Sequence, residues 1–264
     1  EREAHLRSLL IPEVRRRDKN IAFVRMHARF SAPDCHELLN TLTYDRTYII
    51  DLTGRTPEKI AAAMPKDGRR GVKRAERVAK EAGVVIKDET GMDRATFDEV
   101  YRVLEETSER DGFTPHSADV YWTMLTTLGE QARMYVARLD GRPVAWVLVT
   151  VNGISSVAYY GASTTADRAT RAAEATDWYA ACDLAAKGYK GYDFMGAGST
   201  RVPELYSVGM YKKRFAQHPT EVDGAWDVPV QRPVFEALVA AKKAKHLVRK
   251  ATVVASKASE AIKR

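Results

Sequence analysis

The sequence has only two cysteines, Cys35 and Cys182, in a chain of 264 residues. Their spacing fits neither a disulfide framework nor a structural zinc site, which argues against a disulfide-stapled secreted domain and favours a reducing cytoplasm. Long apolar runs are also missing. The longest largely apolar stretch, Val144–Val151, is far shorter than the roughly 20 residues of a membrane-spanning helix. We therefore expect a globular cytoplasmic protein.

Several motifs that reveal chemistry directly are absent as well. The sequence contains no G-x-x-x-x-G-K-[ST] loop, no G-x-G-x-x-G after a strand and no H-E-x-x-H, and its six histidines are scattered. The Arg/Gln-x-x-G-x-G/A type of turn that holds the pyrophosphate of acetyl-CoA is also missing, since the nearest run, Arg69–Gly71, lies within a basic helix. We expect neither a metal nor a cofactor, and the residues alone leave the reaction open.

The sequence has an excess of positive charge. The net charge is +7 and the pI is about 9.3, which favours a polyanionic partner such as a nucleic acid or a phosphorylated ligand. The stretch 66–80 carries seven Lys or Arg against two acids. Helical spacing gathers four of these cations along one side of the helix: Arg70, Lys73, Arg74 and Arg77. This side is either a solvated face or a contact with phosphates, and both interpretations stay open.

The order of expected elements indicates an α/β fold. Apolar and β-branched runs predict strands at 20–26, 47–52, 84–86, 133–139, 143–151, 154–160, 189–195 and 225–230. Helices are expected at 1–17, from Thr56 to an interruption at Pro65, and then at 66–80, 95–110, after Ser117, at 169–187 and at 233–264. The strand, helix and strand of 154–195 predict a parallel, right-handed crossover. The basic segment 233–264 fits a solvated tail, an RNA contact or a contact with anionic lipid.

The stretch 190–215 combines the end of a strand, a loop rich in glycine and serine, and the cationic segment Tyr211–Phe215. Ligands bind preferentially where strands of an α/β sheet end. A lysine just beyond such a loop is suited to an anion or a developing oxyanion. The alternative is an ordinary loop followed by a solvated basic turn.

Six stretches together resemble the Fem-type aminoacyltransferases of bacterial cell-wall synthesis (FemA, FemB and FemX relatives). Each is weak alone, but their order along the chain is specific. They are Thr43–Leu52, the strand before a basic helix; 66–83, like TRYxIRKAxKxGV; Arg110–Phe113, the RDGF turn; Tyr160–Ser163 with Arg168 and Trp178, like YGAS…R…W; Tyr192–Phe194 with Gly196, like YDFGG; and Tyr211, Lys212 and Phe215, like FKxxF.

The resemblance implies two lobes, each like a GNAT (acyl-CoA N-acyltransferase) domain. The first would comprise 1–83, incomplete at its N-terminus and completed by 217–264, and the second 84–216. The implied reaction moves an amino acid from aminoacyl-tRNA to the stem-peptide amine of a peptidoglycan precursor, either UDP-MurNAc-peptide or lipid II. Because the ester is already activated, neither metal nor ATP is needed. A monomer in the cytoplasm, or at the inner face of the membrane with a peripheral contact, is expected.

The same resemblance assigns roles to residues. Lys212 matches the catalytic cation. Residues expected to bind substrate are Arg168, which suits a phosphate, together with Tyr160, Tyr211, Ser163 and Asp193. The cations expected to contact tRNA are Arg70, Lys73, Arg74 and Arg77.

The chain also departs from the family pattern. The acid of the usual RxDP is replaced by His27. The second glycine of YDFGG is also altered, since Met195 precedes Gly196 and Ala197 follows it. The stretch 66–120 has no room for a coiled-coil arm, which makes the chain FemX-like. Three alternatives stay open. They are tRNA-dependent transfer to a peptide natural product, an acyl-CoA-dependent N-acyltransferase, and a non-catalytic RNA- or membrane-binding relative.

Overall fold

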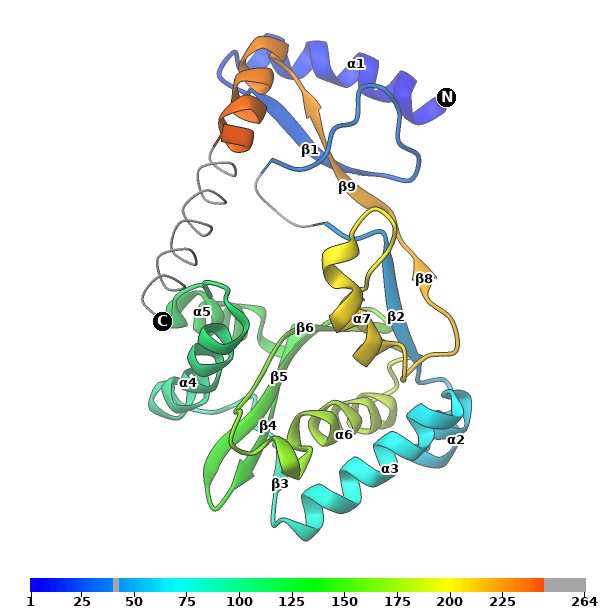
Figure 1. The fold of residues 1–264 in the computed structure, drawn as a ribbon, viewed down its shortest axis with the longest axis vertical. Helices are drawn as coiled ribbons and strands as arrows, with labels where there is room; N and C mark the ends of the chain where they lie inside the picture. Colours follow the sequence, from blue (N-terminus) through cyan, green and yellow to red (C-terminus); the bar gives the residue numbers. More distant parts are fainter. Residues whose placement is uncertain (40–42, 245–264) are drawn as a thin grey trace, which may run out of the picture. The chain divides into compact units, whose positions relative to one another are not determined.

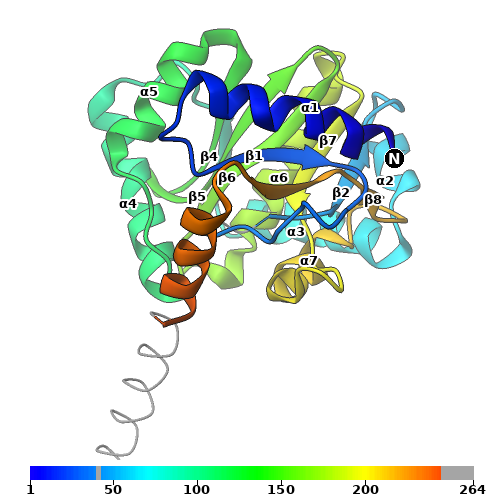
Figure 2. The ribbon, with the colours of Figure 1, turned by 90° about the horizontal axis from the view of Figure 1, so that it is seen from above.

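The computed structural model describes residues 1–39 and 43–244 (Figures 1 and 2). It divides into two compact units, one formed by residues 1–45 and 222–264 and the other by Arg46–Glu221. Both α-helices and β-strands occur in each unit, so the mixed α/β class is confirmed.

A seven-stranded mixed sheet forms the centre of the larger unit, with the strand order β3-β4-β5-β6-β7-β2-β8. Only β6 and β7 pair in parallel, and every other neighbour is antiparallel. The parallel crossover predicted for 154–195 is therefore confirmed. The strands are β2 (Arg46–Asp51), β3 (Val85–Asp88), β4 (Ala132–Leu139), β5 (Arg142–Asn152), β6 (Ser155–Ser163), β7 (Gly191–Gly196) and β8 (Thr220–Glu221).

Helices cover both faces of this sheet (Figure 1). On one face lie α2 (Pro57–Ala63), α3 (Lys66–Glu81) and α6 (Ala172–Ala186); on the other lie α4 (Arg94–Asp111) and α5 (Ala118–Leu128). The period of two along a strand explains this arrangement, since Tyr135 of β4 packs with the first group while Met134 and Val136 pack with the second. A short helix, α7 (Tyr206–Lys212), follows β7.

Local sequence signals set the ends of several helices. Thr56 caps α2 by accepting a hydrogen bond from the Lys59 N–H (3.4 Å), with proline at the first helical position. Pro65 separates α2 from α3, as predicted. Gly112 ends α4 in the left-handed conformation that glycine adopts without strain.

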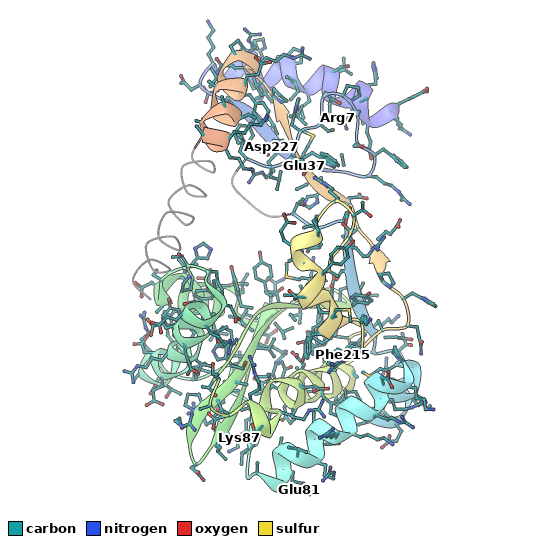
Figure 3. The ribbon with its side chains drawn as sticks, in the orientation of Figure 1. Arg7, Glu37, Glu81, Lys87, Phe215 and Asp227 are labelled. Carbon is teal, nitrogen blue, oxygen red and sulfur yellow. The ribbon has the colours of Figure 1, made fainter. Side chains whose placement is uncertain are left out.

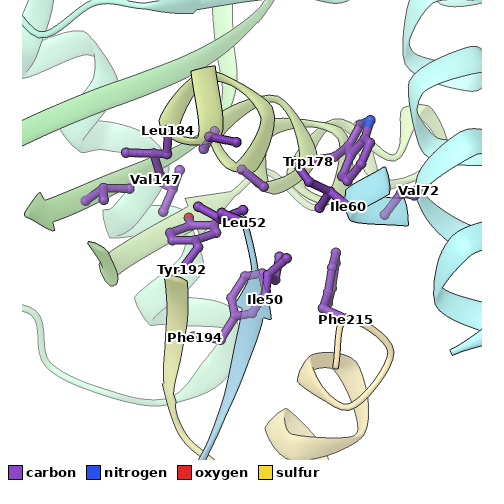
Figure 4. Packing of buried hydrophobic residues seen from close by; sticks show 14 of the residues in the cluster. Ile50, Leu52, Ile60, Val72, Val147, Trp178, Leu184, Tyr192, Phe194 and Phe215 are labelled. Carbon is purple, nitrogen blue, oxygen red and sulfur yellow. The ribbon is translucent and has the colours of Figure 1, made fainter. Parts of the chain in front are cut away.

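The core under α6 also fixes the segment after α7. Phe215 is 2% exposed and points into the same cluster as Ile50, Phe194 and Trp178 (Figure 4). Burying such a side chain stabilises the fold by about 2 kcal/mol or more. The chain is thus anchored three residues after Lys212, which limits how far Lys212 can move.

The smaller unit contains α1 (Arg2–Arg17), the antiparallel pair β1 (Phe23–Ala28) and β9 (Gly224–Pro229), and a helix over 232–244. Arg25 and Asp227 lie opposite each other in this pair and form a two-pronged ion pair, at 2.7 and 3.0 Å. Asp227, labelled in Figure 3, is fully buried and also accepts a hydrogen bond from the Leu39 N–H. Residues 245–264 of the predicted C-terminal helix lie outside the described residues.

The compact units differ from the predicted lobes in their boundaries. The sequence placed 47–83 in the first lobe, but β2 pairs with β7 and α3 packs on α6, so both belong to the larger unit. The division falls at 45/46 and 221/222 rather than at 83/84 and 216/217. Long-range pairing of this kind leaves no local trace in a sequence. Among the described residues, no helix is both long enough and apolar enough to cross a membrane.

Candidate functional site

The parallel strands β6 and β7 are paired only at their beginnings. The pairing runs from Ser155 opposite Gly191 to Val157 opposite Asp193, and beyond it β6 continues unpaired with β7 to Ser163. A bulge at Tyr159 interrupts the pairing of β6 with β5 in the same region. The carboxyl ends of two parallel strands, freed from each other, are the usual place for a ligand in such a sheet.

Lys212 is the last residue of α7, and its side chain reaches the end of β7. Its Nζ donates a 2.6 Å hydrogen bond to the Gly196 carbonyl oxygen, the last residue of the strand. Burial lowers the pKa of Lys212 to about 8, against the attraction of Asp193 and Asp177, which favours the charged form. The structure therefore presents a half-buried ammonium with N–H groups to spare, suited to meeting a developing negative charge.

Next to Lys212, Tyr211 donates a 2.5 Å hydrogen bond from its hydroxyl to Asp177 Oδ2 on α6. Burial raises the pKa of Asp177 to about 7, and the negative charge of Glu174 adds to this, while the hydrogen bond from Tyr211 acts the other way. Sequence reasoning missed Asp177. The only sign was its place directly before Trp178, which belongs to the matched YGAS…R…W series.

Asp193 shapes the turn that ends β7. Its Oδ1 accepts the Met195 N–H (2.6 Å) and contacts the Thr47 hydroxyl, which also lies 2.8 Å from the Met195 carbonyl oxygen. Met195 has φ = 60°, a conformation that favours glycine. Asp193 and Thr47 thus hold a non-glycine residue in a conformation that glycine would adopt without strain. A substrate-binding role for Asp193 stays a prediction.

The other residues expected to bind substrate lie on the α4 side. Tyr160 packs edge-on against Tyr121 of α5 (4.6 Å between ring centroids). The backbone of Ser163 is held by Thr107 and Arg110 of α4. No hydrogen bond, ion pair or ring contact within the described part of the chain joins these two residues to Lys212. They stay predictions.

Arg168 is exposed in the loop between β6 and α6, and its side chain makes no hydrogen bond or ion pair with the described residues. The pKa of Asp111 is lowered mainly by the hydrogen bond from Arg110, and the positive charge of Arg168 nearby adds a smaller effect in the same direction. A free, exposed guanidinium is available for an anionic ligand.

The loop between β6 and α6 is where an acyl-CoA pyrophosphate would meet the start of a helix. Here it contains no glycine, and Arg171 takes the cap position with φ = 56°. Glu106 accepts the Thr165 N–H (2.7 Å), and Asp167 lies in the loop bound by Arg142 and Thr164. Further amides donate within the protein, namely Thr164, Arg168, Thr170, Arg171 and Ala172. These N–H donors are already bonded and cannot bind a pyrophosphate, and the two carboxylates would repel its negative charge. The residues of this loop therefore do not fit a pyrophosphate.

The basic helix α3 buries one side and exposes the other. Val72, Ala75 and Ala79 are buried in the cores of the larger unit. All four cations expected to contact tRNA are exposed, and Arg77 forms an ion pair with Glu81 (2.9 Å). Within the described ranges the other three make no ion pair: Arg70, Lys73 and Arg74.

The comparison with families covers the region just described. The family model "Acetyltransferase (GNAT) domain" matches residues 66–213, from the start of α3 to the end of α7. The chain belongs to this GNAT acetyltransferase domain family. No curated protein matches the sequence.

Solved structures share the fold at low sequence identity. FemX is 16% identical with a TM-score of 0.63, over 81% of this chain and 68% of FemX. L-PGS from Bacillus licheniformis is 12% identical with a TM-score of 0.53, over 84% of this chain and 66% of L-PGS. The chain thus spans about two thirds of each. The predicted two-lobe, GNAT-like architecture is confirmed, and we describe the protein as a GNAT-type acyltransferase.

Two further expectations concern metals and His27. In the described part of the chain, no group of three or more His, Cys, Asp or Glu side chains is arranged to hold a metal ion. His27 replaces the acid of the family pattern, and its Nδ1 lies 2.7 Å from the Asp223 carbonyl oxygen.

Proposed function

We propose that this GNAT-type acyltransferase takes an amino acid from aminoacyl-tRNA and joins it to the stem-peptide amine of a peptidoglycan precursor. The acceptor would be UDP-MurNAc-peptide or its lipid-linked form. The ordered series of Fem-type motifs supports this assignment. The similarity to FemX adds support, but only for the fold.

The observation that carries the proposal is the loop between β6 and α6. On a GNAT-type sheet this loop would hold the pyrophosphate of an acyl-CoA, yet here Glu106 and Asp167 occupy it and most of its amides are already bonded. An ester at the end of a tRNA needs no such pyrophosphate site. A donor of this kind suits the exposed cations of α3, since phosphates of a nucleic acid are bound mainly by charge.

The proposed reaction uses Lys212 at the end of β7. The acceptor amine attacks the ester carbonyl, so a C–N bond forms and the carbonyl oxygen becomes negative. The intermediate collapses by cleavage of the C–O bond to the terminal ribose, whose oxygen takes up the proton that the amine loses. A positioned cation at the oxyanion stabilises this transition state by a few kcal/mol. Arg168 is available for a phosphate of the precursor.

A transfer assay with two competing donors tests the proposal. The protein is given bulk tRNA charged with radiolabelled amino acids, or radiolabelled acetyl-CoA, with UDP-MurNAc-pentapeptide or lipid II as the acceptor. We expect label to pass from charged tRNA to an acceptor. Treating the charged tRNA with mild base beforehand, which hydrolyses the ester, should abolish this transfer. Transfer from acetyl-CoA alone would contradict the proposal and favour an ordinary N-acyltransferase. Transfer from tRNA only to other peptides would move the acceptor to a peptide natural product.

A further inference from the structure

Two tyrosine–aspartate hydrogen bonds end on the same helix, α6. Tyr211 donates to Asp177 (2.5 Å), and Tyr135 donates to Asp183 (2.7 Å). Asp183 also pairs with Lys187, the residue that follows the end of α6. Asp177 has no ion-pair partner among the described residues, although Lys212, the residue after Tyr211, lies within range of its charge.

Asp177 is half-buried, and its carboxyl group is desolvated. A desolvated carboxylate without an ion pair is costly, because loss of water favours its neutral form. Glu174, one turn earlier on α6, makes this worse by adding a second negative charge. Hydrophobic packing alone would be served better by an uncharged residue at 177. The position of Asp177 therefore calls for a role other than stability.

The surroundings of Lys212 suggest that role. Among the residues that the structure describes, its ammonium donates one hydrogen bond, to the Gly196 carbonyl oxygen, and this neutral acceptor fixes the ammonium without balancing its charge. Two carboxylates act on it: Asp193, whose charge has the larger effect and which also holds the turn at Met195 and Thr47, and Asp177. Asp177 is the carboxylate that is tied to the helix of Lys212 itself, through Tyr211.

We propose that Asp177 is the positioning residue for Lys212: it holds α7 through the Tyr211 hydroxyl and adds to Asp193 a second countercharge that helps to keep the ammonium charged at the end of β7. The functional part rests on the proposed role of Lys212 as the cation of aminoacyl transfer. The charged and titratable groups that face Lys212 and Tyr211 are Asp177 and Glu174 on α6, Tyr192 and Asp193 on β7, and Tyr211 itself on α7.

Asp177→Asn and Tyr211→Phe separate the two parts of this role. The asparagine keeps the volume and an oxygen that can accept from Tyr211, but it removes the charge. The phenylalanine keeps the ring and the Asp177 carboxyl, but it removes the hydrogen bond. Asp183→Asn is the matched control, since it makes the same change to the other tyrosine-bonded aspartate of α6.

Competitive labelling with trace acetic anhydride tests the charge directly. The reagent modifies only neutral amines, so the labelling of Lys212 against pH, read by mass spectrometry, follows its protonation without any substrate. We expect Asp177→Asn to move this curve to lower pH by about one unit, and Asp183→Asn to leave it in place. The exposed neighbour Lys213 is an internal reference. An unmoved Lys212 curve in Asp177→Asn would overturn the countercharge.

The transfer assay tests the consequence. The alkaline limb of activity should move to lower pH in Asp177→Asn by the same amount as the labelling curve, which a merely structural role would not cause. Tyr211→Phe should lower kcat about tenfold with KM for tRNA unchanged, and full kcat in this variant would overturn the positioning. If the wild-type protein transfers nothing from charged tRNA, the proposed function fails, while the labelling curves still decide the role of Asp177. Thermal melting checks that each variant is folded.

Discussion

Gly68, in the first turn of α3, lies against the backbone of Arg214: a Cβ placed on Gly68 would come 1.6 Å from the Arg214 carbonyl oxygen. The contact joins the start of the basic helix to the segment between Lys212 and Phe215. Because backbone cannot yield as a side chain does, no residue other than glycine fits here without moving one of the two segments.

Gly68→Ala should therefore destabilise the protein and misplace Lys212. We expect the free energy of unfolding to fall by about 1–3 kcal/mol and transfer to fall by about tenfold or more. Gly71→Ala is the matched control one turn later, since its Cβ would meet only the end of the Glu174 side chain at 2.9 Å. Urea unfolding and the transfer assay should show little change for Gly71→Ala. Equal effects of both changes would refute the specific contact with Arg214.

These contacts also show what the sequence could and could not predict. The crossover β6–α6–β7 and the break at Pro65 were predicted correctly, because local hydrophobic periodicity and proline geometry determine them. The pairing of β2 with β7 was not predicted, because it joins segments that are far apart in the chain. Lys212 came from a motif, whereas its neighbour Asp177 belongs to a different element and only the fold brings the two together.

Met195 gives a prediction about backbone strain. Its φ of 60° suits glycine and is worst for a β-branched residue. We expect Met195→Gly to be at least as stable as the wild-type protein, and Met195→Val to be less stable by about 1 kcal/mol, as measured by urea unfolding. A strongly destabilised Met195→Gly would mean that the half-buried methionine side chain, rather than the turn, matters at this position.

Lys212 and Lys213 form a natural pair for testing catalysis. Lys212 is half-buried and bonded to Gly196, while Lys213 is exposed. Lys212→Ala should lower kcat by about a hundredfold or more, because the oxyanion loses its cation, and Lys213→Ala should change kcat less than about threefold. Steady-state transfer from charged tRNA measures both. A fully active Lys212→Ala would remove the basis of the proposed mechanism.

The exposed side of α3 gives a prediction about salt. If Arg70, Lys73 and Arg74 contact tRNA phosphates, affinity should fall steeply with salt concentration, and each alanine substitution should reduce the slope of log K against log salt by about 1. Lys87→Ala is the control, since Lys87 is exposed on β3 of the same unit (Figure 3). Filter binding of tRNA at several salt concentrations gives the slopes. Slopes unaffected by the α3 substitutions would place the tRNA elsewhere.

The last prediction follows from the cost of burying Asp177. Its folded pKa of about 7 lies above the ordinary value of 3.8, so the folded state binds the proton more tightly than the unfolded state. The contribution to stability is complete below the unfolded pKa and is lost as the pH rises through 7. Asp177→Asn does not titrate, so between pH 4.5 and 7 it should gain roughly 3 kcal/mol relative to the wild-type protein.

Asp88→Asn is the control for this measurement. Burial pushes the pKa of Asp88 upwards, but the hydrogen bonds from Thr90 and the charge of Lys187 outweigh burial and lower it. Its contribution to stability is therefore present throughout pH 4.5–7 and is lost only at lower pH, so its difference from the wild-type protein should stay constant in that range. Urea unfolding at a series of pH values compares the three proteins. A constant difference for Asp177→Asn as well would show that Asp177 is already ionised at pH 4.5, and Asp177 would then impose no pH-dependent cost on the fold.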